Sequence, residues 1–482
     1  MRSGLCFGGL CGLISLSPAA AWAQENPAEA RPSEDAMFGE PSPTEPSAVP
    51  SPEPAAVPPT AAAVPPTAAA DGLAMSNAAN AETLDLGGRL LLRGTVSFTT
   101  DAAPEDAALS MPNVLDVYLD ARPHDRLRAY AEVRMTYDPT LENGRASLPD
   151  LCVSSRPETD REQVSCRQVE DAISRGLAPS PTTFGLTQLW LKTDIDRSIY
   201  LTIGRQTLKW GASHIWNPTD FIQRQRRDPL AALDLRTGVT LIKAHLPLES
   251  QTANLYAIGL LDEARTVGDV GGAARGELAF GSAEVSLTLA KRRGEPLLLG
   301  GDLSTGVGPL DLFVEAAVAH GHHQPLPGQA ARDDAFIPQL SGGLDLQIEY
   351  GDEDALTVGG EVFFNDDGLT DASLAGSAIA SGRSPFYLPR TAVGLFLLAL
   401  GPGRFDDTSI IATLIAHPSD KSGLGRLSVS QRVSTFLTVA PYVSAYFGDE
   451  GDLFRQDLNG FQEGAESSYA IGDLGLWLQM AM

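Results

Sequence analysis

Apolar and polar residues alternate along most of the chain from residue 84 onward. In the first such stretch one face carries Leu84, Leu86, Leu90, Leu92, Val96 and Phe98. The opposite face carries Asp85, Arg89, Arg93, Thr95 and Ser97. A period of two with one apolar face predicts a β-strand. Charged residues would be costly in the core of a water-soluble protein, so the pattern indicates that the polar face lines water and the apolar face contacts lipid.

The same alternation returns in segment after segment, and the connections between the segments alternate in length. Short connections such as 281–282 alternate with long ones such as 139–183 and 211–236. Short turns at one end and long loops at the other are typical of bacterial outer-membrane barrels, whose short turns face the periplasm. The sequence therefore predicts an all-β fold, an antiparallel transmembrane barrel over residues 83–482. Counting segments gives about 18 strands (16–18), with both termini in the periplasm.

The last strand of this pattern runs to the end of the chain. From Tyr469 onward one face carries Leu474, Leu476, Leu478, Met480 and Met482. Such a strand resembles the closing strand of bacterial outer-membrane barrels, which the barrel-assembly machinery recognises. The resemblance implies a location in the bacterial outer membrane, with that machinery and the membrane lipid as partners. The final residue departs from the usual pattern, because Met482 stands where such strands usually end in phenylalanine or tryptophan.

The first 82 residues have a different character. Arg2, an apolar stretch from Leu5 to Leu16 and the small-residue site at 21–23 predict a cleavable signal peptide over residues 1–23. Residues 24–82 are rich in proline and alanine and contain AAVPPT twice, so they are predicted to be a disordered periplasmic tether. Two interpretations of this tether are open. It contacts the cell wall or a periplasmic export partner, or it is a linker without a partner.

Composition narrows the classes of partner. The formal net charge is −26, which argues against nucleic acid as a partner. The 47 glycines fit a barrel better than a helical bundle. Cys152 and Cys166 remain after removal of the signal peptide, and in an oxidising compartment they are predicted to form a disulfide within loop 139–183.

One stretch contains a recognisable motif. It reads Gly204-Arg205-Gln206, then Trp210-Gly211, then Asn217-Pro218-Thr219-Asp220. This G-R-Q…W-G…N-P-x-D pattern resembles that of alginate-export-like outer-membrane barrels. The resemblance implies a monomeric barrel of about 18 strands that conducts a polysaccharide or a small solute. Two roles for Arg205 are open. It turns into the lumen to pair with Glu132 or another inward acid, or it belongs to a structural corner that fixes loop 211–236.

The alternation assigns charged side chains of both signs to the lumen. The predicted pore-lining residues are Arg89, Arg93, Asp116, Asp120, Arg128, Glu132, Arg134, Lys192, Arg205, Glu315, Asp345, Glu349 and Glu361. The bases come early in the chain and most of the acids come later, which predicts one basic wall and an opposite acidic wall. Such a lumen would have weak ion selectivity, whereas an alginate-type lumen would be more uniformly basic.

Histidines and carboxylates in the loops are the remaining candidates for chemistry. His214 and Asp220 share a loop and could pair, but no nucleophile motif surrounds them, so we expect no enzyme activity. His320, His322 and His323 lie close together without a complete ligand set nearby, so we expect no metal and no cofactor. The function predicted from the sequence is a passive channel for a polysaccharide, oligosaccharide or other small polar solute, with polysaccharide export as one setting. The alternative is a scaffold barrel that holds a partner in its lumen.

Overall fold

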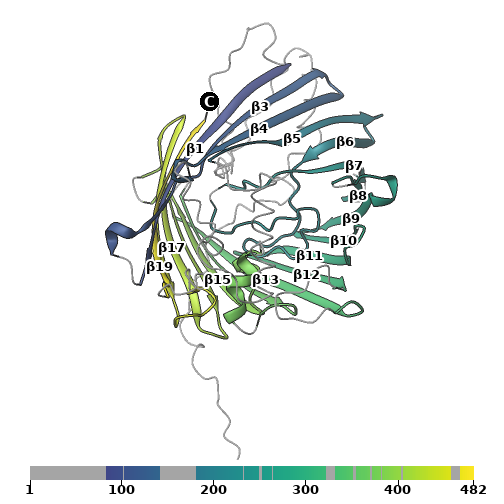
Figure 1. Ribbon diagram of the computed structural model, residues 1–482. Helices are drawn as coiled ribbons and strands as arrows, with labels where there is room; N and C mark the ends of the chain where they lie inside the picture. Colours follow the sequence, from purple (N-terminus) through teal and green to yellow (C-terminus); the bar gives the residue numbers. More distant parts are fainter. Residues whose placement is uncertain are drawn as a thin grey trace, which may run out of the picture.

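The computed structural model shows one closed antiparallel barrel (Figure 1). Its described residues are 83–100, 103–141, 181–231, 233–248, 252–262, 264–321, 332–350, 354–369, 372–380, 383–402, 405–456 and 467–481. The predicted signal peptide and tether, the two cysteines of the predicted disulfide, and Met482 lie outside them. No helix in this described part of the chain is long and apolar enough to cross a membrane.

Eighteen long strands form the wall, and each pairs with the next along the chain. They are β1 (Leu84–Thr99), β3 (Asn113–His124), β4 (Leu127–Tyr137), β5 (Thr182–Ile195), β6 (Ile199–Gln206), β7 (Val239–Leu248), β8 (Ala253–Leu260), β9 (Gly271–Phe280), β10 (Ala283–Lys291), β11 (Leu297–Val307), β12 (Leu310–His320), β13 (Phe336–Glu349), β14 (Ala355–Asn365), β15 (Thr391–Leu400), β16 (Thr408–His417), β17 (Ser422–Ser434), β18 (Leu437–Phe447) and β19 (Ala470–Ala481). The predicted fold class and strand number are confirmed.

A few short elements lie in the connections. The strand β2 (Ala108–Ser110) folds back onto the end of β1. The helical elements are α3 (Ala375–Ala380) and the 3-10 turns η1 (Pro104–Asp106), η2 (Pro139–Leu141), η5 (Val267–Asp269), η6 (Ala372–Leu374) and η7 (Pro385–Tyr387). These pieces occupy the long-loop end of the barrel, so the predicted alternation of short turns and long loops is confirmed.

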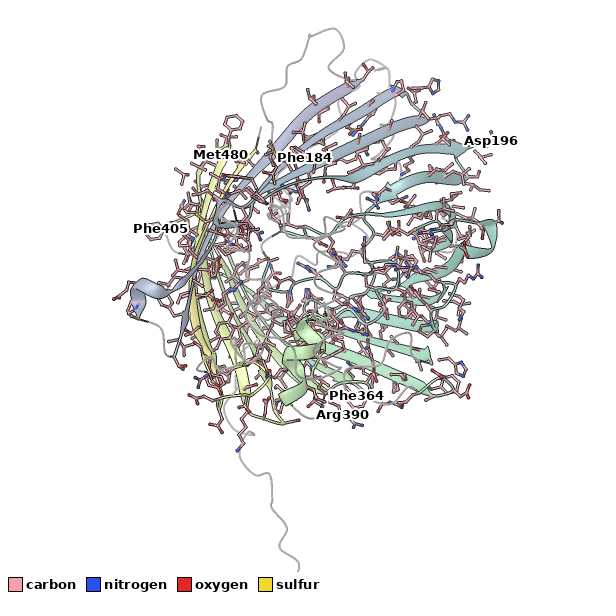
Figure 2. The ribbon with its side chains drawn as sticks, in the orientation of Figure 1. Phe184, Asp196, Phe364, Arg390, Phe405 and Met480 are labelled. Carbon is pink, nitrogen blue, oxygen red and sulfur yellow. The ribbon has the colours of Figure 1, made fainter. Side chains whose placement is uncertain are left out.

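The barrel closes where its first strand pairs with its last, from Arg89 opposite Ala481 to Phe98 opposite Gly472. On β19 the side chain of Leu474 is 50% exposed, whereas that of Trp477 is only 8% exposed. The predicted facing of this strand is therefore confirmed. Side chains project from both faces of the curved sheet all around the barrel (Figure 2). The exposed outer face is rich in large apolar residues, as a lipid-facing wall requires.

Glycines on the inner face make room for aromatic rings of the neighbouring strand. Gly87 pairs with Tyr118, and a Cβ on Gly87 would lie only 2.4 Å from the tyrosine hydroxyl oxygen. Gly475 pairs with Tyr442, where the closest ring atom would be 2.1 Å away. Each ring thus leans across the glycine of its partner strand, an arrangement in which an aromatic side chain covers backbone that the glycine leaves bare.

The strands β15 and β16 are apolar on both faces, and the structure explains why. Leu395 is 51% exposed on the outer face. Ala392 and Ile415 are buried on the inner face, in a cluster with Ile215 and Trp216 from the connection between β6 and β7. Their inner apolar residues are therefore covered by a long loop that enters the barrel.

Candidate pore and its inserted segment

The connection between β6 and β7, residues 207–238, folds into the barrel, and we call it the inserted segment. In Figure 1 it runs inside the curved sheet between these two strands. Trp210 and Trp216 on this segment are buried. Gly211 has a φ of 101°, and a Cβ there would lie 2.4 Å from a carboxylate oxygen of Glu315. Only glycine allows this turn and this close approach.

Glu315 on β12 holds the first half of the inserted segment and is 0% exposed. One carboxylate oxygen accepts hydrogen bonds from the Ser213 amide at 2.7 Å and from the Asn217 side-chain amide at 3.1 Å. The other accepts from the Thr219 hydroxyl at 2.7 Å and the Thr219 amide at 3.2 Å. A residue predicted to line the pore is therefore an anchor, and the N-P-x-D motif supplies two of its three partners, Asn217 and Thr219.

Glu361 on β14 is a second anchor of the same kind. It accepts hydrogen bonds from three consecutive backbone amides, those of His214 at 3.1 Å, Ile215 at 2.9 Å and Trp216 at 2.8 Å. The Ser341 hydroxyl donates a fourth at 2.6 Å. A carboxylate that receives several charge-assisted hydrogen bonds fixes the local backbone strongly. The two glutamates together determine the path of residues 213–219.

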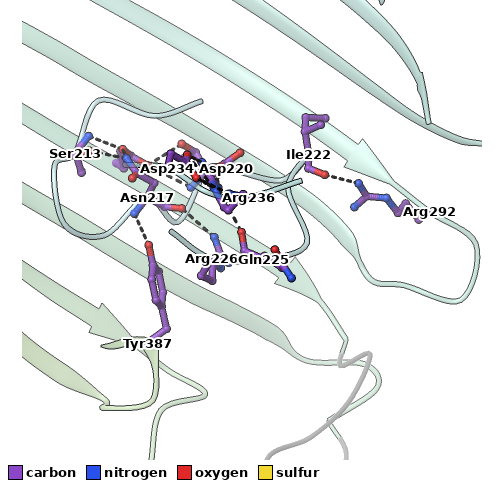
Figure 3. Close-up of polar contacts among 12 residues, drawn as sticks. Ser213, Asn217, Asp220, Ile222, Gln225, Arg226, Asp234, Arg236, Arg292 and Tyr387 are labelled. Carbon is purple, nitrogen blue, oxygen red and sulfur yellow. Dashed lines mark hydrogen bonds and ion pairs between the residues drawn. The ribbon is translucent and has the colours of Figure 1, made fainter. Parts of the chain in front are cut away.

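The second half of the inserted segment is held by arginines (Figure 3). Arg236 lies between two carboxylates, 2.8 Å from Asp220 and 2.7 Å from Asp234. Burial raises the pKa of Asp220, and the adjacent Arg236 opposes this rise. Burial would also raise the pKa of Asp234, but the hydrogen bonds from Arg236 outweigh it and lower that pKa. Arg292, which follows β10, donates to the Ile222 carbonyl at 2.7 Å.

The inserted segment reaches the far walls of the barrel as well. Arg134 on β4 donates to the carbonyl of Leu235. Arg426 on β17 donates to the carbonyl of Leu230 at 3.3 Å. The side chain of Leu235 packs with the buried cluster that contains Leu91 of β1. This one connection therefore contacts strands on several sides of the lumen and narrows it.

On the wall formed by β1, β3 and β4 the charged side chains pair with one another. Asp116 accepts from Arg89 at 2.8 Å and from Arg134 at 2.6 Å. Arg128 is 2.7 Å from Asp120. The expectation of a basic wall opposite an acidic wall is wrong here, because these arginines have their counter-charges on neighbouring strands.

Three other predicted residues also lie on the inner face. Arg93 donates to the carbonyl of Pro112 at 3.0 Å. Glu132 accepts from the Thr187 hydroxyl at 2.7 Å. Lys192 is buried, with its ammonium group 5.7 Å from the centre of the Tyr200 ring. Their sequence neighbours Leu92, Val133 and Leu191 are exposed on the outer face, which agrees with the predicted inward register.

Asp345 and Glu349 share the inner register of β13 but differ in surroundings. Asp345 is buried, and its carboxylate is 2.7 Å from Nε2 of His214 on the inserted segment. Glu349 is exposed at the last residue of the strand. Because His214 faces Asp345 and Asp220 faces Arg236, the His214–Asp220 pair considered from the sequence does not exist.

The prediction that Arg205 faces the lumen is wrong. Arg205 pairs with Leu189, whose side chain is exposed on the outer face, while the next residue, Gln206, is buried inside. The guanidinium of Arg205 donates to the Leu186 carbonyl at 3.0 Å and does not reach Glu132. Strict alternation continues through Gly204 despite its positive φ. Arg205 therefore lies on the outer face of β6.

Sequence reasoning missed one buried charge network on the inner face. Arg275 on β9 is 2.7 Å from Glu277 and 3.0 Å from Asp302 of β11. The alternation within β9 places Arg275 and Glu277 on one face, and this pattern could have indicated that both side chains point inward.

Among the described residues no group of three or more His, Cys, Asp or Glu side chains is arranged to hold a metal ion. His320 lies at the end of β12, where its ring packs 4.9 Å from that of Phe336. His322 and His323 lie outside the described residues.

Comparison with known proteins adds information about the fold. No family model and no curated protein matches the sequence. The crystal structure of Acinetobacter baumannii OccAB4 is similar with a TM-score of 0.50 and 9% identity, over 83% of this chain and 99% of that one. Acinetobacter baumannii OccAB1 gives 0.50 and 9%, over 86% and 99%. Both similarities concern the barrel fold, and neither supports the narrower resemblance to alginate-export proteins. With its apolar outer face, the chain is an 18-stranded barrel of a bacterial outer membrane.

Proposed function

We propose that the chain is a passive channel that lets small polar solutes cross the outer membrane. The observation that carries this proposal is the contrast between the two faces of the wall. The outer face is apolar, whereas the inner face carries buried and half-buried charged groups on many strands. Charged groups on an inner wall are favourable where water and polar solutes contact them.

The inserted segment supports a size limit for this channel. Its anchors, Glu315 and Glu361, hold it against one wall, and its contacts with Arg134 and Arg426 bring it to others. A lumen narrowed in this way suits monosaccharide- to oligosaccharide-sized solutes better than a polymer. Polysaccharide export would require the segment to move aside.

The scaffold alternative has one observation in its favour, the apolar clusters inside the barrel. One of them contains Trp216, Leu369 and Phe454, which come from three different long connections. These inner apolar surfaces are covered by the chain's own loops, so they do not require a separate partner. For this reason we prefer the channel.

Planar-bilayer recording tests the proposal. The purified protein is expected to give discrete conductance steps with weak ion selectivity, because Asp116 and Asp120 offset the neighbouring arginines. Liposome-swelling assays are expected to show entry of monosaccharides and exclusion of dextran. A barrel that never conducts, even when the inserted segment is released by substitution of its anchors, would make the scaffold the better interpretation.

Two partner proposals accompany the channel. Assembly through the terminal strand and contact with lipid predict that Leu476→Arg, on the exposed face of β19, reduces membrane levels, because a cation on the lipid face costs roughly 2–4 kcal/mol near mid-membrane. The inward-facing variant Trp477→Phe is the control.

For residues 24–82 we propose contact with the cell wall or an export partner. Sedimentation with peptidoglycan would test contact with the cell wall.

A further inference from the structure

Three aromatic side chains form a row on the inner face of neighbouring strands. They are Tyr118 on β3, Tyr130 on β4 and Trp190 on β5, and we call them the aromatic row. The ring centres of Tyr118 and Tyr130 are 6.0 Å apart with planes 17° apart. Those of Tyr130 and Trp190 are 5.4 Å apart with planes 18° apart. All three rings are half-buried, so part of each remains accessible.

Polar groups border the aromatic row. The Tyr130 hydroxyl donates to Glu132 at 2.8 Å. The guanidinium of Arg128 lies 5.5 Å from the centre of the Trp190 ring. The same guanidinium donates two hydrogen bonds to Asp120, at 2.9 Å and 2.7 Å. Apolar rings and fixed hydrogen-bonding groups therefore share one patch of the inner wall.

The aromatic row differs from the three buried tryptophans inside the barrel. Trp210, Trp216 and Trp477 are buried in the three apolar clusters to which the inserted segment contributes. Tyr118, Tyr130 and Trp190 belong to none of these clusters. Stacking among the three rings stabilises the wall. That contribution explains why the rings adjoin one another, but it does not explain why they stand on a water-facing wall.

We propose that the aromatic row binds a neutral sugar ring as it passes through the lumen. This inference rests on the proposed function as a channel and names its class of solute. A pyranose has an apolar face of C–H groups, which suits aromatic rings, and a rim of hydroxyl groups. Those hydroxyls match Asp120, Glu132 and Arg128, which accept and donate hydrogen bonds. An anionic solute fits less well, because it would meet the carboxylates of Asp120 and Glu132 beside the rings.

Tryptophan fluorescence provides the test, since Trp190 is half-buried while Trp210, Trp216 and Trp477 are buried. Maltotriose is titrated into the full-length protein in detergent, with benzoate as an anionic aromatic probe. We expect a saturable change in tryptophan fluorescence with maltotriose and little change with benzoate. Sugar-induced current block is then compared between the wild type and a Tyr118→Leu/Tyr130→Leu variant, which retains Trp190 as the reporter. The dissociation constant is expected to rise at least tenfold, which corresponds to about 1.4 kcal/mol.

The matched control is Phe184→Leu, which removes an aromatic ring from the outer face of the same strand as Trp190. Heat-modifiable migration on gels verifies that each variant folds. Binding of maltotriose that is unchanged in the double variant would place the sugar elsewhere and overturn the proposal. So would preference for benzoate, or no sugar binding at all. The fluorescence measurement does not depend on conduction. A barrel that binds the sugar but never conducts would refute only the proposed channel function. A barrel that conducts but binds no sugar would refute only the proposed sugar binding by the aromatic row.

Discussion

Two walls of the barrel neutralise their inward charges in different ways. On the wall of β1, β3 and β4, Asp116 pairs with Arg89 and Arg134 of the adjacent strands. On the wall of β12 and β14, Glu315 and Glu361 receive backbone amides of the inserted segment instead. The first wall satisfies the carboxylate of Asp116 within the sheet. The second wall needs the inserted segment to supply hydrogen bonds to its carboxylates.

This difference makes the second wall and the inserted segment interdependent. An unsatisfied carboxylate in a partly enclosed site is costly, and so are backbone amides that lose their acceptor. We therefore expect substitutions on the second wall to change the shape of the lumen. Substitutions on the first wall should mainly change its charge.

The largest effect is expected when both anchors are removed. In Glu315→Ala/Glu361→Ala, the amides of residues 213–216 and 219 lose their acceptors, at about 1–3 kcal/mol for each one that stays buried. The inserted segment should leave its position. We expect at least a twofold increase in single-channel conductance and faster hydrogen exchange across residues 212–220.

Two controls accompany this variant. Glu349→Gln changes an exposed acid at the end of β13, and it should leave conductance and exchange unchanged. Glu315→Gln/Glu361→Gln retains one carbonyl acceptor at each site, so it should give a smaller effect than the alanine variant. If the alanine variant conducts and exchanges like the wild type, the two glutamates do not hold the segment.

A smaller effect is expected from Asp116→Asn on the first wall. The substitution keeps the shape of the side chain but leaves Arg89 and Arg134 without their shared carboxylate. The local field becomes more positive, so the reversal potential in a salt gradient should shift toward anion preference with little change in conductance. A large conductance change without a selectivity change would mean that this wall also depends on Asp116 for its shape.

The sequence predicted the wall well because the wall obeys a local rule. A period of two assigns each side chain to a face, and this gave the inner register of Asp116 and the outer register of Leu476. The prediction failed at Arg205, because Gly204 was taken as a reason to depart from this rule.

The roles of Glu315, Glu361 and the aromatic row depended on contacts that alternation cannot supply. Glu361 lies 145 residues from Trp216 along the chain, and nothing near either residue in sequence identifies the other. The aromatic row needs the lateral alignment of three strands, which follows from register and not from periodicity. Long-range contacts therefore decide whether an inward-facing charged residue lines the pore or anchors the inserted segment.

The smallest expected effect concerns a carboxylate anchor at the rim, Asp420 in the short loop after β16. Burial would raise the pKa of Asp420, but hydrogen bonds from the Leu453 and Ser422 amides outweigh it and hold the pKa below the usual 3.8. A lowered carboxyl pKa contributes stability that is complete above 3.8 and is lost as the pH falls through the folded-state value. Hydrogen exchange at Leu453, corrected for the intrinsic rate, should therefore accelerate below about pH 4. Asp420→Asn should exchange faster at pH 6 and lose the pH dependence. The same acid-induced acceleration in that variant would assign the effect to another group, and the rim would then differ from the wall of β12 and β14 in how its loop is held.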